Sequence, residues 1–261
     1  MRRIVLMSLM LSFAIQPASL ARSRKSPETI AAGQVASVVD GDTVRLESGS
    51  QIRLTGIQAP KLPLGRRGFR AWPLSKESKT FLERLTLNRA VSLRYDGRRI
   101  DRHGRLLAHL YDNKNRWVQG EIIARGMARV YSFPDNRSRT AGLLALERKA
   151  RTARRGIWEH RFYRILKSDE TSGFIGTFQL VEGRVMSAAV VRGRCYLNFG
   201  ENWRTDFTIS ISPRSRRSFK RAGLMIKSYK GHILRVRGWL KSFNGPMIEA
   251  THPEQIEVLE E

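Results

Sequence analysis

The sequence contains a single cysteine, Cys195, among 261 residues. One cysteine excludes an intramolecular disulfide framework, and no spacing of Cys and His indicates a zinc site. Cys195 lies in a short stretch that is typical of a strand, so we interpret it as a buried structural thiol rather than a nucleophile. The chain is therefore neither a disulfide scaffold nor a zinc module.

Long apolar runs are also scarce. The longest covers residues 4–15, follows Arg2 and Arg3, and is followed by small residues up to Ala21. This layout is typical of a secretory signal peptide, and the run is too short to cross a bilayer comfortably. We predict a signal peptide over residues 1–21 and a protein that is exported, periplasmic or secreted, with no stable transmembrane anchor after cleavage. An uncleaved anchor is the alternative.

Acidic residues are few beside the basic ones, 23 against 48, which gives a net charge of +25. Removal of residues 1–21 takes away two arginines and no acid, so the mature chain keeps +23. A surface this basic attracts polyanions, and DNA or RNA is the commonest of them. A binder of anionic lipid or envelope polymer fits the same charge. Nothing in the sequence distinguishes DNA from RNA or sets the oligomeric state.

The first half of the chain alternates short strand patterns with helical ones. Turn residues separate alternating segments, and Gly126 and Gly156 mark helix ends. The predicted strands are 34–39, 43–46, 51–54, 90–95 and 106–111, and the predicted helices start near Pro73 and cover 118–125 and 138–155. Interleaved helices without a repeating strand–helix–strand unit predict an α+β fold, a small barrel with helices packed on it.

The second half is separated by a break and then turns to strand patterns. We predict a disordered lead-in over residues 22–32, a linker over 161–176, and a second small, mostly-β domain over 177–261, for which an OB-like barrel is one candidate. A basic helical segment interrupts its strands at residues 214–221. Two domains of these sizes are each long enough to bury a core.

Four short motifs occur in order along the first half: residues 39–46 (VDGDTVRL), 53–60 (RLTGIQAP), 101–105 (DRHGR) and 156–158 (GIW). Together they resemble the staphylococcal nuclease (thermonuclease) family over residues 33–160. The resemblance implies an OB-fold barrel with packed helices. It also implies a phosphodiester site in which Ca²⁺ and two arginines surround the phosphate while a carboxylate activates water.

The resemblance assigns roles to individual residues. Asp42 matches a metal carboxylate, Arg53 and Arg105 match the two catalytic, phosphate-binding arginines, and Tyr131 and Phe133 lie where aromatic residues border the nucleotide. Guanidinium groups suit this task, because their planar fork matches phosphate oxygens and stays protonated. The alternatives are a turn-stabilising aspartate, two solvated arginines and two core aromatics.

Two positions depart from the family pattern. Gln58 stands where a second metal carboxylate is expected, and Lys61 stands where the catalytic glutamate is expected. An amide offers oxygen without charge, and a protonated lysine has no acceptor for a water proton. We therefore expect Ca²⁺ binding, implied by the resemblance, to be weak or absent, and Lys61 to help hold phosphate. An atypical endonuclease and a non-catalytic nucleic-acid-binding protein both remain open. His103 is a candidate proton carrier or an exposed turn residue.

The second domain carries aromatic residues beside arginines. Such pairs suit the stacking of single-stranded bases, but we interpret Phe199, Phe207 and Trp239 as core. The densest basic cluster adds either affinity for a polyanion or a solvated helix face. It consists of Arg214, Arg216, Arg217, Lys220 and Arg221.

Overall fold

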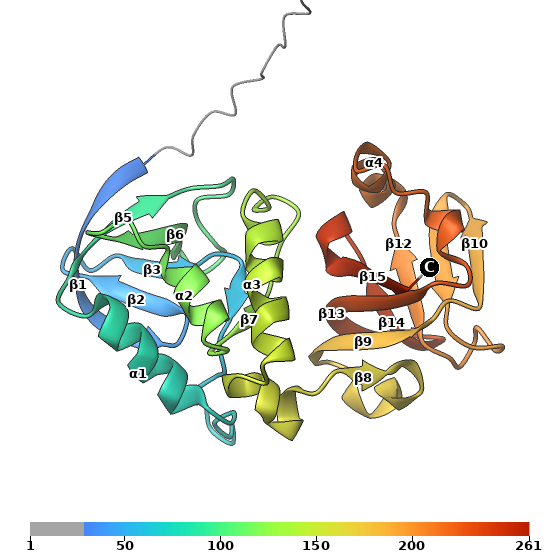
Figure 1. The fold of residues 1–261 in the computed structure, drawn as a ribbon, viewed down its shortest axis with the longest axis horizontal. Coiled ribbons are helices and arrows are strands. Elements are labelled where there is room, and N and C mark those ends of the chain that lie inside the picture. Colours follow the sequence, from blue (N-terminus) through green and yellow to red (C-terminus); the bar gives the residue numbers. More distant parts are fainter. Residues whose placement is uncertain (1–28, 261) are drawn as a thin grey trace, which may run out of the picture.

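The computed structural model describes residues 29–260 and shows two parts packed side by side (Figure 1). The predicted signal peptide and most of the predicted lead-in lie outside the described residues. Each part has its own cluster of buried apolar residues. Helix α3 lies in the N-terminal part, at its boundary with the C-terminal sheet (Figure 1).

Five strands of the N-terminal part close into a barrel in the order β1-β2-β3-β6-β5. They are β1 (Thr29–Asp40), β2 (Thr43–Leu46), β3 (Gln51–Leu54), β5 (Ala90–Arg94) and β6 (Leu106–Asp112). Strands β3 and β6 pair in parallel, and this pairing joins the β1–β3 segment of the barrel to the β5–β6 segment. Residues 29–32 are not lead-in, because they extend β1 and pair with β5.

Three helices pack on the barrel: α1 (Ser75–Thr86), α2 (Val118–Ala124) and α3 (Thr140–Thr152). Leu82, Ile122 and Leu143 project from them into the barrel core and are fully buried. The α+β prediction, a barrel with packed helices, is therefore confirmed. Within residues 29–260, no helix has the length and apolar content that a membrane crossing requires.

A two-stranded sheet of β4 (Ile57–Gln58) and β7 (Arg129–Val130) lies beside the barrel. Two residues are too few to show alternation, so the sequence pattern did not predict either strand. The antiparallel register places Gln58 opposite Arg129. This pairing therefore fixes the position of Gln58, one of the two residues that depart from the family pattern, next to Arg129.

The C-terminal part is an eight-stranded sheet in the order β10-β11-β12-β14-β13-β9-β8, with β15 paired to β13. The strands are β8 (Leu166–Lys167), β9 (Phe178–Arg184), β10 (Ser187–Val191), β11 (Arg194–Asn198), β12 (Thr208–Ile211), β13 (Ile233–Phe243), β14 (Gly245–Glu249) and β15 (Ile256–Glu260). Cys195, Phe199 and Phe207 are buried in its core, as expected, and α4 (Pro213–Arg221) covers one end.

The predicted linker holds regular structure. It contains the 3₁₀ helices η2 (Arg161–Tyr163) and η3 (Ser168–Phe174) and strand β8, which pairs in parallel with β9. Leu166 is buried in the C-terminal core, and the Tyr163 hydroxyl donates to the Pro73 carbonyl at 2.6 Å. Residues 161–176 therefore anchor the two parts to each other, a role that polar, Gly-containing sequence did not reveal. Three further 3₁₀ helices are η1 (Gly156–Glu159), η4 (Ile226–Tyr229) and η5 (Pro253–Gln255).

A buried ionic network joins the parts. Arg237 of β13 is 1% exposed, and its Nη2 lies 2.7 Å from Oε2 of Glu147 on α3 and 2.7 Å from Oε1 of Glu257 on β15. Arg151 of α3 completes the network with an Nη2–Oε2 distance of 3.1 Å to Glu257. Each buried charge thus has partners, two of the four residues coming from each part. A network of this kind fixes one relative position of the two parts, because any other would leave buried charges unpaired.

Acid is expected to weaken this junction. Burial acts to raise the pKa of Glu257, but Arg237 and Arg151 lower it from 4.5 to about 2. A carboxylate with a depressed folded pKa contributes stability above its unfolded pKa and loses it as pH falls through the folded value. The free energy of unfolding should therefore fall from about pH 4.5 to about pH 2. In Glu257→Gln this fall should be smaller by roughly 3 kcal/mol.

Urea unfolding at a series of pH values measures how steeply the free energy of unfolding falls with acid in Glu257→Gln and in the unaltered protein. Glu254→Gln is the matched control, because Glu254 pairs with Arg137 across the same junction but is more exposed. In this control, the free energy of unfolding should fall with acid almost as steeply as in the unaltered protein. Identical slopes for Glu257→Gln and the unaltered protein would show that Glu257 does not carry this pH dependence.

Candidate nucleic-acid site

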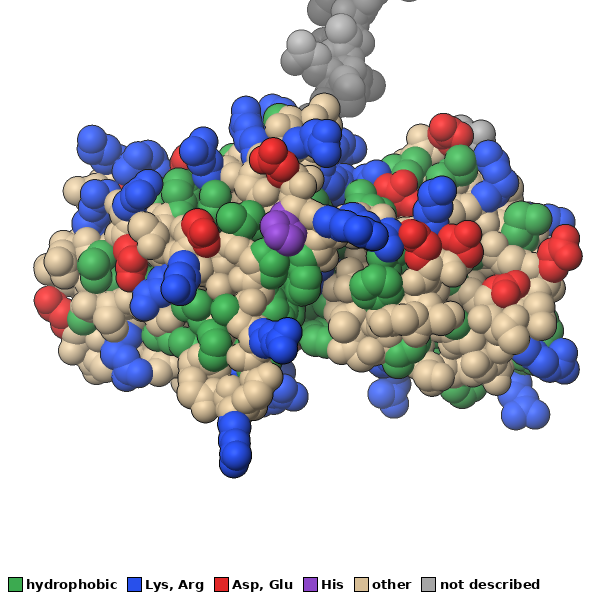
Figure 2. Space-filling view, turned by 90° about the horizontal axis from the view of Figure 1, so that it is seen from below, with side chains coloured by type: hydrophobic (Ala, Val, Ile, Leu, Met, Phe, Trp, Pro, Cys, Tyr) green, Lys and Arg blue, Asp and Glu red, His purple; other side chains and the backbone are tan. Residues whose placement is uncertain are grey.

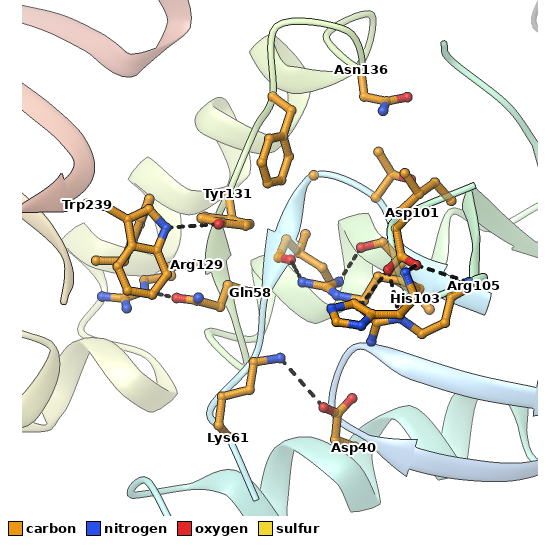
Figure 3. Close-up of a pocket in the computed structure, with 18 of the residues that line it drawn as sticks. Asp40, Gln58, Lys61, Asp101, His103, Arg105, Arg129, Tyr131, Asn136 and Trp239 are labelled. Atoms are coloured by element: carbon orange, nitrogen blue, oxygen red, sulfur yellow. Dashed lines mark hydrogen bonds and ion pairs between the residues drawn. The ribbon is translucent and has the colours of Figure 1, made fainter. Parts of the chain in front are cut away.

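A cleft of about 1010 Å³ opens where the two parts meet (Figure 3). Its walls come from β3 and β4, the 101–105 turn, β7 with the loop after it, and residues of β9 and β13. Seven Lys and Arg side chains line it against three Asp side chains. A concave surface with this excess of positive charge concentrates anions.

Asp42 lies in the turn between β1 and β2, in contact with Arg53 and Lys61, which line one end of the cleft. Its side chain is fully buried, and both carboxylate oxygens are occupied. Lys61 Nζ lies 2.9 Å from Oδ1 and 2.7 Å from Oδ2, the Ala59 amide donates to Oδ2 at 2.7 Å, and Arg53 Nη2 lies 3.2 Å from Oδ2. The ammonium group of Lys61 therefore sits directly against the carboxylate that the resemblance assigned to metal.

Asp40 faces the same ammonium group, at an Oδ2–Nζ distance of 3.6 Å (Figure 3). Burial and the neighbouring charge of Asp42 raise the pKa of Asp40, against the pull of Lys61 and Arg53. Burial also acts to raise the pKa of Asp42, but Arg53 and Lys61 outweigh it and hold that pKa well below its usual range. Asp42 thus stays ionised, and the four groups form a compact set of two carboxylates and two cations.

Gln58 turns away from this set. Its Oε1 accepts a hydrogen bond from Arg129 Nε at 2.9 Å (Figure 3). Arg129 is buried, and burial lowers its pKa to about 10. The single oxygen that Gln58 could offer to a cation is therefore committed to a guanidinium group.

These residues do not fit Ca²⁺. Ca²⁺ needs six to eight oxygen ligands, several of them charged. Here an ammonium group covers both oxygens of Asp42, and Gln58 is engaged by Arg129. Among residues 29–260, no group of three or more His, Cys, Asp or Glu side chains is arranged to hold a metal ion.

The two arginines that the resemblance marked as catalytic differ in their surroundings. Arg53 lines the cleft but is only 12% exposed, and it donates to the backbone carbonyls of Leu54 and Ile57 at 2.5 and 2.7 Å. Arg105 is 29% exposed and is held from one side by Asp101, with Nε and Nη2 at 2.8 and 2.7 Å from Oδ2. Arg105 is thus oriented and still able to meet a ligand, whereas Arg53 mainly holds the barrel and Asp42.

The remaining predicted residues also lie on the cleft. Tyr131 and Phe133 line it with their rings edge to face at 4.8 Å, and Phe133 is 47% exposed. His103 is an exposed residue of the 101–105 turn, and its Nε2 accepts from Arg102 Nε at 3.1 Å. Lys61 lines the cleft too, although its nitrogen points to the two aspartates.

Three kinds of cleft residue were not predicted. Arg98 precedes the 101–105 motif and Arg102 lies within it, and the basic residues gathered at 98–105 were a usable signal. Arg129 sits two residues before Tyr131 and carries no motif of its own. Trp239 comes from the C-terminal part, and only the packing of the two parts brings it to the cleft.

Comparison with known proteins identifies relatives of this chain. The family described as "Staphylococcal nuclease homologue" matches residues 51–160. A thermonuclease of Staphylococcus hyicus is 27% identical over 130 residues, covering 49% of this chain and 75% of that protein. A thermonuclease of Staphylococcus intermedius is 26% identical over 128 residues, covering 48% and 74%. An uncharacterised protein of Methanocaldococcus jannaschii is 30% identical over 148 residues, covering 48% and 70%.

The chain belongs to the staphylococcal nuclease family, with the family domain in its N-terminal part and a further mostly-β region behind it. The relatives named above match about half of the chain, and the family match at residues 51–160 lies in the N-terminal part.

Proposed function

We propose that this protein binds nucleic-acid phosphodiesters in the cleft without Ca²⁺ and does not cleave them by the family's metal-dependent route. One observation carries the proposal: Lys61 Nζ contacts both oxygens of Asp42 at 2.9 and 2.7 Å. A cation belonging to the chain itself thereby takes the place next to the carboxylate that a metal would need. The proposal includes an exported location, which rests on the sequence pattern of residues 1–21.

The distribution of charge within the cleft supports a phosphate position at one of its ends. At one end, Lys61 and Arg53 are balanced by Asp40 and Asp42, so this end attracts anions weakly. At the other, Arg98, Arg102 and Arg105 are opposed by Asp101 and Asp135. Arg105 keeps its Nη1 hydrogens free of partners among the described residues, and a guanidinium edge matches phosphate oxygens. These charges support a phosphate position at the Arg105 end.

Hydrolysis needs a group that takes a proton from the attacking water. Lys61 stands at the position where the family pattern places a glutamate, and in its ammonium form it has no lone pair for this proton. Both oxygens of Asp42 beside it accept hydrogen bonds, from Lys61 and from the Ala59 amide. Asp40 accepts from the Asp42 amide and lies 3.6 Å from Lys61 Nζ. The cleft thus retains charge that can hold a phosphodiester, while neither Lys61 nor Asp42 is free to act as the base.

Binding of a fluorescent single-stranded oligonucleotide tests this function. We expect affinity in chelator equal to that in Ca²⁺, and a steep decrease with salt, because each phosphate contact releases counterions. Arg105→Ala should weaken binding about tenfold, since a charge-assisted hydrogen bond contributes roughly 1.5–3 kcal/mol. It should also reduce the slope of the logarithm of the binding constant against the logarithm of the salt concentration (the salt slope) by about one.

Arg148→Ala is the matched control, because Arg148 is exposed on α3 and lies outside the cleft. It should change affinity little. Equal losses in the two variants would show that binding is a general effect of the +25 charge. Binding to vesicles of anionic lipid with no binding of the oligonucleotide would replace the proposal by the envelope alternative.

A further inference from the structure

The C-terminal part supplies one wall of the cleft. Trp239, which the sequence pattern favoured as a core residue, is 44% exposed and faces the cleft from β13. Its Nε1 donates to the hydroxyl of Tyr131 at 2.9 Å, across the boundary between the two parts (Figure 3). Phe178 packs edge to face against both rings, at 4.8 Å from Tyr131 and 6.3 Å from Trp239. Phe133, Tyr131, Phe178 and Trp239 thus form a continuous aromatic wall.

A second group of aromatics lines the same cleft from the N-terminal side of the junction. The Trp72 ring stacks on Phe69 with a centroid distance of 6.4 Å and is tilted against Phe162 at 5.6 Å, and Phe162 is 48% exposed. The guanidinium group of Arg129 lies between the two groups, 5.8 Å from the Trp72 ring and 4.7 Å from the Phe178 ring. Hydrophobic side chains gather in the seam between the two lobes, while Lys and Arg project around the outline (Figure 2). The cleft therefore has an aromatic half next to its cationic half.

The wall is held in place before any ligand binds. Trp239 lies two residues after Arg237, whose guanidinium is buried in the network with Glu147 and Glu257. Gln255 fixes the same strand by donating to the Arg237 carbonyl at 2.9 Å. A rigid aromatic surface costs little conformational entropy when it binds a flat partner. An exposed tryptophan of this kind, set beside cations, matches a nucleobase next to its phosphates.

We propose that Trp239 stacks an unpaired base of a single strand whose phosphate lies at Arg105, so that the C-terminal sheet is half of the binding site. The proposal rests on the proposed function. The strand must be single because the faces of bases in a duplex are covered by their neighbours. Stacking on an aromatic side chain contributes about 1–3 kcal/mol per base, which is roughly 5- to 150-fold in affinity. Trp239 then selects single-stranded over double-stranded nucleic acid.

The test compares Trp239→Ala, Trp239→Phe and the unaltered full-length protein by fluorescence anisotropy. The probes are a labelled single-stranded oligonucleotide and the duplex of the same sequence, at one salt concentration and then over a salt series. Trp239→Ala should weaken single-strand binding at least about fivefold and leave duplex binding and the salt slope unchanged. Trp239→Phe should restore most of the affinity, because it keeps a ring and loses only the hydrogen bond to Tyr131.

Trp203→Ala is the control, since Trp203 is 49% exposed, lies outside the cleft and stacks with a neighbouring arginine, Arg204. It should bind like the unaltered protein. Unchanged single-strand binding in Trp239→Ala, with Arg105→Ala still impaired, overturns this inference and leaves the proposed function standing. Equal weakening of single strand and duplex also overturns it. Insensitivity of both Trp239→Ala and Arg105→Ala refutes the proposed function itself.

Discussion

Calcium binding is expected in the double variant Gln58→Asp with Lys61→Glu, where the unaltered protein should bind none measurably. The two changes remove the ammonium group from Asp42 and add two carboxylates, a swing of three charge units beside Asp40 and Asp42. At about 4 Å and an effective dielectric near 20, one pair of unit charges is worth roughly 4 kcal/mol. The site therefore changes from a balanced set of two carboxylates and two cations to a net negative one, which attracts a divalent cation.

The same variant should be unstable until the ion is added. Without Lys61, four carboxylates repel one another at a buried position, and the free energy of unfolding should fall by several kcal/mol. Ca²⁺ should restore it, by about 2.7 kcal/mol when its concentration is a hundred times the Kd. Calorimetric titration should give a Kd of about 10⁻⁴–10⁻³ M, in the range of weak protein calcium sites.

Lys61→Gln separates the two effects, because it removes the ammonium group without adding negative charge. It should be destabilised and should not be rescued by Ca²⁺. Calcium-dependent stabilisation of the unaltered protein as large as that of the double variant would show that Lys61 does not block the site.

Replacing Arg237 by Met is expected to cost about 3–5 kcal/mol in the free energy of unfolding. The substitution removes the cation that Glu147 and Glu257 share at 2.7 Å, and both carboxylates are then left in a site with little water. Breaking a buried ion pair by removing one partner has a cost of this size. Thermal and urea unfolding measure it directly.

Arg137→Met is the matched control across the same boundary. Arg137 pairs with Glu254 at 2.9 Å, but both side chains are partly exposed. Exposed pairs contribute about 0–1 kcal/mol, so this variant should unfold almost like the unaltered protein. Equal losses in the two variants would contradict the assignment of the junction to the buried network.

The barrel and the position of its site could be predicted because local patterns determine them. Turn residues at 40–42 and 48–50 set the first strands. Of the residues that the four motifs marked, Arg53 and Arg105 line one cleft and Asp42 contacts Arg53 beside it, whereas their roles stay predictions. The departures at Gln58 and Lys61 were also visible in the sequence, and they led to the expectation that Ca²⁺ binding is weak or absent. The structure adds the partner of each: Arg129 for Gln58 and the aspartate pair for Lys61.

The features that could not be predicted depend on contacts between distant segments. Lys61 was expected to help hold phosphate, and that role stays a prediction. The direction of its side chain, toward Asp40 and Asp42, could not be predicted, because no sequence pattern shows which way a long side chain turns. The burial of Arg237 follows only from the docking of β13 and β15 against α3. Trp239 looked like one of several core aromatics, since exposure at a junction depends on where two parts meet.

The central claim is tested most directly by measuring binding and cleavage in the same samples. The full-length protein is incubated with single-stranded DNA, plasmid DNA and RNA, once in Ca²⁺ and once in chelator. The account predicts binding of equal strength in both solutions and intact nucleic acid in both. Rapid cleavage that needs Ca²⁺ would contradict it, because it would require a metal site where Lys61 and Asp42 now lie 2.7 Å apart.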